Sequence, residues 1–170
     1  LPVVTTFAVF CLRAFEQARL PIAYCRRNVK IVASHPGLDV GPDGGSAQAL
    51  EDIAAFRALP GMTVVSPADP LEMELATRAI LDFEGPVYMR TGRSAIRRIL
   101  DEDATFEIGR GTILVDGSDV SIIACGVEVA RALDAAAILV EEGISARVVN
   151  ISTIKPIDAE LIVRCVEETG

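Results

Sequence analysis

The sequence predicts an α/β fold built on a parallel sheet covered by helices, and three observations favour this class. Apolar, β-branched runs that do not alternate with polar residues recur along the chain, as in strands buried on both faces of a sheet. Helical patterns of roughly 10 to 15 residues separate these runs. Half of the 170 residues are hydrophobic (51%), which is enough to bury a core.

The first three elements are predicted by apolar runs and by the residues that interrupt them. Residues 1–10 are apolar and β-branched, which predicts a strand. Residues 13–27 mix apolar and charged side chains in a helical manner, interrupted by Pro21. Residues 28–34 then predict a second strand, which leads into a glycine-rich loop over residues 35–46.

The next helix is expected to start at a cap and to end at a Pro-Gly pair. Ser46 can cap it, and residues 60–61 end it. Its expected apolar face consists of Ala49, Leu50, Ile53, Ala54 and Phe56. A strand over residues 62–65, a helix over residues 69–83 with Pro70 in its first turn, and a strand over residues 87–90 complete this part.

A second module is expected after a linker. The segment from Ser94 to Glu107 has no clean periodicity, so we divide the chain into residues 1–100, a linker at 101–108 and residues 109–170. The second module is expected to hold strands at 120–124 and 146–151, a helix at 128–142 closed by Gly143, and a last helix at 158–168. We expect both modules to be cut at the ends of this chain.

Composition excludes several classes of protein. With 16 Lys and Arg against 24 Asp and Glu the net charge is −8, which argues against binding nucleic acid or an anionic membrane. The most apolar stretches, residues 1–11 and 132–140, are shorter than the roughly 20 residues that span a bilayer. The four cysteines form no C-x-x-C pair and there is one histidine, so no zinc site is expected. Reduced thiols and the lack of a signal-peptide pattern predict a cytoplasmic protein.

The loop over residues 35–46 is the strongest candidate for a functional site. It places four glycines beside Asp39, Asp43 and the single histidine, His35, directly after a strand. Ligands of open α/β sheets bind at the carboxyl ends of strands, and glycine lets the backbone approach a ligand closely. Neither G-x-G-x-x-G nor the phosphate loop G-x-x-x-x-G-K-[ST] is present. From these residues alone, a binding loop and an ordinary surface loop are both open.

Longer motifs resemble a known family. His35-Pro-Gly-Leu38, Val40-Gly-Pro-Asp-Gly44 and the run from Gln48 to Asp69 resemble the pyrimidine-binding domain of transketolases. Thr6-Phe-Ala-Val-Phe10 is similar to the strand that forms the family's aromatic pocket. The run from Gly85 to Arg93 is similar to the last strand of the family's domain and to its phosphate-binding arginine. From Gly109 onward the chain is similar to the family's C-terminal domain. Asn28-Val-Lys-Ile-Val is typical of split transketolases, whose two halves are separate polypeptides.

The resemblance implies thiamine diphosphate chemistry, in which a two-carbon ketol unit passes from a ketose phosphate to an aldose phosphate. Phe7 and Phe10 would pack around the cofactor's aminopyrimidine, although core packing is the alternative from spacing alone. His35 would act near the reacting carbons as the catalytic residue. Asp43 would bind a substrate hydroxyl and Arg93 the sugar phosphate. Arg90 would assist Arg93 or be an ordinary surface cation.

Two departures from the family pattern limit this assignment. Ala47 stands where the family usually has a histidine, so the hydrogen-bond donor that the family uses for sugar-phosphate turnover is missing at this position. The family's essential glutamate would lie before Leu1, and Glu16 and Glu51 on predicted helices do not replace it. The diphosphate and Mg²⁺ site would lie on an N-terminal domain or subunit, and no metal ligands are expected here. We therefore expect this segment alone to be inactive, and to work as a homodimer, with an N-terminal subunit, or both.

Three rival interpretations stay open. The β subunit of a 2-oxoacid dehydrogenase and deoxyxylulose phosphate synthase share this order of domains. The position of Arg93 and the run Pro67-Ala-Asp69 favour transketolase over both. A non-catalytic scaffolding paralogue is the third rival, and Ala47 is the residue that supports it. The turn in Ile123-Ala-Cys-Gly-Val-Glu-Val-Ala130 could hold an anion, but a structural, dimer-supporting role for this module is favoured.

Overall fold

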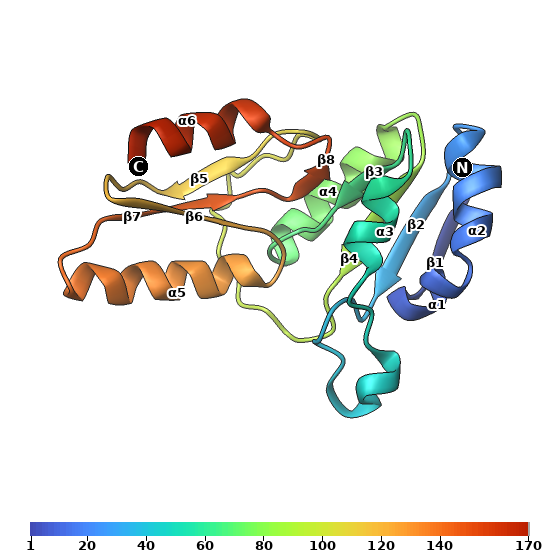
Figure 1. The fold of residues 1–170 in the computed structure, drawn as a ribbon, viewed down its shortest axis with the longest axis horizontal. Helices are drawn as coiled ribbons and strands as arrows, with labels where there is room; N and C mark the ends of the chain where they lie inside the picture. Colours follow the sequence, from blue (N-terminus) through green and yellow to red (C-terminus); the bar gives the residue numbers. More distant parts are fainter. Residues whose placement is uncertain (170) are drawn as a thin grey trace.

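Two β-sheets, each with helices packed on it, make up the part of the chain that the computed structural model describes, residues 1–169 (Figure 1). The larger sheet has five strands in the order β1 (Val3–Phe7), β2 (Lys30–Ser34), β4 (Val87–Thr91), β3 (Thr63–Val65), β8 (Thr153–Lys155). The smaller sheet has three strands in the order β5 (Thr112–Val115), β7 (Ala146–Asn150), β6 (Val120–Ala124). The predicted α/β class is confirmed.

The larger sheet is parallel over its first four strands, as the apolar strand runs predicted. In register, Phe7 of β1 lies beside Ser34 of β2, which lies beside Thr91 of β4. The carboxyl ends of three neighbouring strands therefore meet at one edge of the sheet. β8 comes from the C-terminal half of the chain and pairs with β3 in the antiparallel direction, which the sequence did not predict.

The first strand is shorter than predicted, because the chain turns into a helix at Ala8. Helix α1 (Ala8–Arg13) is followed by the short helix α2 (Phe15–Gln17) and by a π-helical turn, Ala18–Tyr24, that contains Pro21. A short apolar run cannot distinguish a buried strand from a buried helix, which explains the error over residues 8–10. Ala8 and Cys11 face the core on the buried side of α1.

The glycine-rich loop, residues 35–46, and the helix after it also differ from the prediction. Ser46 lies in a 3-10 turn, Gly45–Ala47, and makes no cap; helix α3 (Asp52–Ala58) begins six residues later. Leu50 (60% exposed) lies outside the core, because the chain over residues 48–51 is not helical, and Ala54 lies on the exposed side of α3. Phe56 is fully buried as predicted, and its ring stacks on that of Tyr88 at 3.9 Å between centroids.

Helix α4 (Pro70–Asp82) forms where it was predicted. The Asp69 carboxylate accepts a hydrogen bond from the Glu72 N–H at 2.8 Å, and proline occupies the first turn, where its missing N–H costs nothing. Residues 92–111 then form neither helix nor strand and run between the two sheets.

In the C-terminal half, helices α5 (Glu128–Glu141) and α6 (Ala159–Thr169) lie on opposite faces of the smaller sheet (Figure 1). Gly143, with φ +79°, ends α5 as predicted. β5 was not predicted and pairs antiparallel with β7. Among residues 1–169, no helix has the length and apolar character that crossing a bilayer requires.

Candidate functional site

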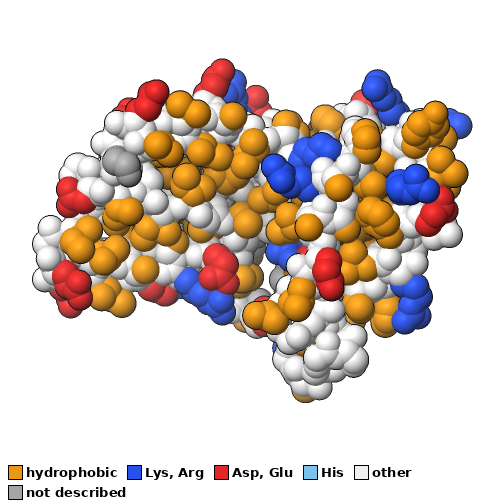
Figure 2. Space-filling model, in the orientation of Figure 1, with side chains coloured by type: hydrophobic (Ala, Val, Ile, Leu, Met, Phe, Trp, Pro, Cys, Tyr) orange, Lys and Arg blue, Asp and Glu red, His pale blue; other side chains and the backbone are white. Residues whose placement is uncertain are grey.

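The candidate site lies where β1, β2 and β4 end side by side. Phe7 is the last residue of β1, His35 follows the last residue of β2, and Arg93 lies two residues beyond the end of β4. Between β2 and α3 the glycine-rich loop projects from this edge of the molecule (Figure 1). Its surface is mostly free of charged side chains in the space-filling view (Figure 2). The parallel topology thus gathers residues that are far apart in sequence.

The first part of the site is aromatic. The Phe7 ring stacks on the His35 imidazole, with centroids 3.8 Å apart and planes within 16°. Phe7 also stacks with Phe10, with centroids 5.8 Å apart and planes within 18°. Phe10, on α1, is 46% exposed, so this row of rings has an open face. Figure 2 shows further hydrophobic surface at the edge formed by β1 and the N-terminal helices.

His35 is held in an unusual backbone conformation. Its φ of +57° lies in the left-handed region, which a residue with a side chain seldom adopts. Such strain persists only where neighbours fix it, and here the ring is fixed on three sides. Phe7 stacks on its face, Ser34 Oγ lies 3.0 Å from Nδ1, and Asp43 Oδ2 lies 3.5 Å from Nε2.

The second part of the site is polar and continues from His35. Asp43 Oδ2 also lies 3.9 Å from Nε of Arg93. These contacts therefore join five side chains into one continuous row, which we call the site row: Phe10, Phe7, His35, Asp43 and Arg93. All five residues singled out from the sequence are brought together, and the role assigned to each stays a prediction.

Two glycines shape the loop that carries Asp43. Gly37 exchanges backbone hydrogen bonds with Ala49, at 2.9 and 3.2 Å, which closes the base of the loop. Gly41 has φ +58°, and the Arg93 guanidinium packs against it so closely that a Cβ would lie 3.0 Å from its Cζ. A side chain at residue 41 would strain the backbone and displace Arg93.

Arg90 does not join the site row. Its Nε and Nη2 donate to the two carboxylate oxygens of Asp52, at 2.8 and 2.6 Å, and the Tyr88 hydroxyl donates to the same carboxylate at 2.6 Å. Asp52 is completely buried, and burial together with this carboxylate raises the pKa of Tyr88. Neither interpretation given for Arg90 foresaw this buried partner, because the sequence does not show that Asp52 points inward.

Other acidic residues lie away from the row or serve the fold. Glu16 pairs with Arg19 at 3.3 Å on the exposed face of α2, and Glu51 is exposed at the start of α3. Glu72 was not singled out from the sequence. Its buried carboxylate accepts the Ala68 N–H at 2.6 Å and the Asn150 amide at 2.9 Å, so it joins α4 to the C-terminal half.

A cavity of about 480 Å³ opens beside the site row, between the two halves of the chain. The glycine-rich loop contributes residues 36–39, β4 contributes Arg90, and the turn before α5 contributes Cys125. Burial raises the pKa of the Cys125 thiol, which keeps it protonated at neutral pH. Within residues 1–169, no group of three or more His, Cys, Asp or Glu side chains could hold a metal ion.

Comparison with known families matches the two parts of the chain separately. The model of the transketolase pyrimidine binding domain matches residues 1–98, more than half of the chain, and that of the transketolase C-terminal domain matches residues 109–170. The chain belongs to the transketolase family. The resemblance inferred from the loop and strand motifs is thereby confirmed.

Two curated relatives are named as parts of transketolases. A protein of Methanocaldococcus jannaschii described as a transketolase C-terminal section is 50% identical over 161 residues, covering 93% of this chain and 51% of that protein. One of the subunits of the apulose-4-phosphate transketolase of Phocaeicola vulgatus is 39% identical over 162 residues, covering 95% and 52%. This transketolase chain spans about half the length of these relatives.

Solved structures agree in fold. A split-gene transketolase, solved as an inactive beta4 tetramer, has a TM-score of 0.92 and 47% identity, covering 99% of this chain and 55% of that chain. A transketolase of Pichia stipitis, in complex with sedoheptulose-7-phosphate, has a TM-score of 0.82 and 31% identity, covering 92% and 24%. The arrangement of both sheets in this transketolase chain is therefore the one found in these structures.

Proposed function

We propose that this chain is part of a thiamine diphosphate-dependent transketolase, which transfers a two-carbon ketol unit from a ketose phosphate to an aldose phosphate. The observation that carries the proposal is the site row, where an open aromatic face, a histidine, a carboxylate and a guanidinium follow one another at the ends of parallel strands. Residues 1–100 and 109–170 would be its two domains, joined by a linker at 101–108.

The substrate class is supported by relatives and by the charge of the site. A relative is named for apulose 4-phosphate and a structural neighbour holds sedoheptulose-7-phosphate, so two family members handle phosphorylated sugars. In this chain Arg93 is 39% exposed beside Asp43, which leaves donors of its planar guanidinium open to a phosphate. The Asp43 carboxylate would accept a hydrogen bond from a sugar hydroxyl.

The residues present fit the pyrimidine ring of the cofactor. Phe7 and Phe10 lie within 18° of parallel, and the open face of Phe10 offers a flat apolar surface to a heteroaromatic ring. When bound, thiamine diphosphate supplies the nucleophile and electron sink for cleavage of the ketose carbon–carbon bond. The two phenylalanines would orient the ring and exclude water from one side of it.

His35 would handle the proton of the substrate hydroxyl. Its imidazole is fixed between Phe7 and Asp43, so it meets the substrate in one orientation. An imidazole can accept or return a proton, and Asp43 would orient Nε2 for that transfer. Phe7 stacking keeps the ring from rotating away between these steps.

The complete enzyme would need a second component. We propose that an N-terminal transketolase domain or subunit supplies the diphosphate and Mg²⁺ site, and that the cofactor is enclosed in a dimer. One relative is named as a C-terminal section and another as one subunit of a transketolase, and both names support such an assembly. On this view residues 1–170 alone do not catalyse ketol transfer.

The test uses the full-length protein with its N-terminal partner, thiamine diphosphate, Mg²⁺, a ketose phosphate donor and an aldose phosphate acceptor. We expect ketol transfer, and in the Arg93→Ala variant a KM raised about tenfold or more for phosphorylated substrates and far less for unphosphorylated ones. Arg98→Ala, which removes an exposed arginine of the same segment, is the matched control. Decarboxylation of 2-oxoacids without ketol transfer would contradict the proposal, and absence of cofactor binding would leave the scaffolding role.

A further inference from the structure

The position of Arg93 depends on how two irregular segments are held together. Arg93 lies on residues 92–111, which form neither helix nor strand, and Asp43 lies on the glycine-rich loop, which holds only two 3-10 turns. The ion pair between them is exposed, and its closest atoms are 3.9 Å apart. Exposed pairs of this kind contribute about 0 to 1 kcal/mol, too little to fix two irregular segments relative to one another.

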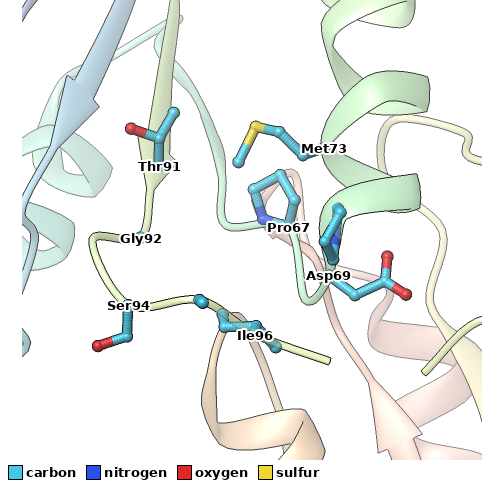
Figure 3. Close-up of a pocket in the computed structure, with 9 residues that line it drawn as sticks. Pro67, Asp69, Met73, Thr91, Gly92, Ser94 and Ile96 are labelled. Atoms are coloured by element: carbon cyan, nitrogen blue, oxygen red, sulfur yellow. The ribbon is translucent and has the colours of Figure 1, made fainter. Parts of the chain in front are cut away.

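A stronger contact lies directly beside Arg93. The Asp39 carboxylate, on the glycine-rich loop, accepts the Ser94 N–H at 3.1 Å through one oxygen and the Ser94 hydroxyl at 2.5 Å through the other. The Ser94 side chain points out of the pocket lined by Pro67 and Met73, away from both residues (Figure 3). Hydrogen bonds from Ser94 hold the pKa of Asp39 below its usual value, so the acceptor is ionised at neutral pH and both bonds are charge-assisted.

The far end of the same segment is fixed independently. The Asp69 carboxylate, at the start of α4, accepts the N–H groups of Ile99 and Leu100, each at 2.9 Å. Residues 94–100 are therefore held at one end by the glycine-rich loop and at the other by α4. Because Arg93 lies outside this span, next to Ser94, loss of the Asp69 contacts would free the distal end, whereas loss of the Asp39 contacts would free Arg93 itself.

We propose that Asp39 is a positioning residue for sugar-phosphate binding, because its two bonds to Ser94 hold the Arg93 guanidinium over Gly41 and beside Asp43. The inference rests on the proposed function and extends it to a residue that does not touch the site row. Asp39 acts on the phosphate end of the substrate through Arg93 and leaves Phe7 and His35, at the reacting end, unchanged.

The proposal predicts a change that depends on the substrate's phosphate. In the full-length enzyme with its partner and cofactor, we expect Asp39→Ala to raise KM for the phosphorylated donor about tenfold, since two hydrogen bonds of about 0.5 to 1.5 kcal/mol each hold Arg93. KM for an unphosphorylated ketose and kcat for both donors are expected to change less than about twofold. Asp39→Asn keeps one acceptor oxygen and is expected to restore part of the loss.

Two controls separate positioning from general loss of structure. Asp134→Ala removes the exposed partner of Arg97 on the same segment and is expected to leave both KM values unchanged. In the Arg93→Ala background, Asp39→Ala is expected to add nothing to KM for the phosphorylated donor, because the group that it positions is gone.

Equal effects on phosphorylated and unphosphorylated donors, or full additivity of the two variants, would overturn the role of Asp39 while the proposed function stands. If the wild-type assembly transferred no ketol unit, both proposals would fall together. If ketol transfer occurs and Asp39→Ala is selective for the phosphate, the positioning role is supported.

Discussion

Removal of the Asp52 carboxylate should destabilise the chain more than any other single change near the glycine-rich loop. Asp52 is completely buried on α3 and accepts three hydrogen bonds, one from the Tyr88 hydroxyl and two from the Arg90 guanidinium, at 2.6 to 2.8 Å. Arg90 Nη2 in turn lies 3.7 Å from where a Cβ on Gly37 would stand, at the base of the loop. In Asp52→Ala the guanidinium and the phenol both lose their acceptor.

The expected loss of unfolding free energy follows from the polar groups of Arg90 and Tyr88 that stay in place without their acceptor. Breaking a buried ion pair by removing one partner costs about 3 to 5 kcal/mol, and since the Arg90 side chain is 19% exposed we expect the lower end, about 3 kcal/mol. Tyr88→Phe removes one hydrogen bond to a charged acceptor and keeps the ion pair, so we expect about 1.5 kcal/mol. Replacing both charged partners, in Asp52→Ala with Arg90→Met, should recover part of the loss, because no unpaired charge is left inside.

Urea unfolding of the full-length protein, followed by circular dichroism, measures these differences. With a slope of about 3 kcal/mol per molar, a loss of 3 kcal/mol moves the midpoint by about 1 M. A cost below about 1 kcal/mol for Asp52→Ala would refute the reasoning. So would a double variant whose loss equals the sum of the single losses, since the pair would then not be coupled.

Three further outcomes are expected. Glu72→Ala should cost about 3 kcal/mol in urea unfolding, because it leaves buried donors of both halves unpaired, whereas Glu74→Ala, exposed on the same helix, should cost less than about 0.5. Iodoacetamide at pH 8, with peptide mapping, should label exposed Cys25 and spare buried Cys11, whose pKa burial raises to about 11; equal labelling would contradict this. Because the pKa of Asp39 is lowered, the ionised carboxylate stabilises the fold above about pH 4, and this stabilisation is lost as the pH falls further. Between about pH 6 and pH 3, Asp39→Asn should therefore lose less unfolding free energy than the wild type. Equal losses in the two proteins would contradict the lowered pKa of Asp39.

The parallel strands could be predicted because they rest on local patterns, whereas the residues of the site row were singled out by their resemblance to family motifs. Residues 28–34, 62–65 and 87–90 are apolar runs bounded by turn residues, and each contains a strand. Parallel strands that neighbour one another end at the same edge, so residues that follow them meet whatever their distance in sequence. The same rule brings His35 and Arg93 together across more than fifty residues of chain.

Other features depend on contacts that no local pattern encodes. β8 has three residues, and its pairing with β3, like the buried hydrogen bond from Asn150 to Glu72, joins segments that lie far apart in the sequence. The inward orientation of Asp52 depends on the partners that strand β4 brings to it. A charged residue at the start of a helix is usually solvated, and burial becomes favourable only when a guanidinium and a hydroxyl are already in place.

Local sequence pattern and contacts between distant segments both act at the glycine-rich loop. Together they explain how an irregular segment can have a defined conformation at a specific site. The loop has few apolar side chains of its own, so packing alone cannot give it one conformation. Three anchors from outside supply the missing order: the Gly37–Ala49 bridge at its base, the Arg90 guanidinium beneath it and Ser94 at its outer side. Each anchor comes from a different part of the chain, so the geometry at Asp43 depends on the non-helical segment before α3, on β4 and on the 92–111 segment at once. It follows that substitutions far from the site row on any of these elements should act first on the Asp43–Arg93 pair, which the proposed function assigns to the substrate's phosphate end. His35 depends on them less, because its ring is also held by Phe7 and Ser34 at the ends of β1 and β2.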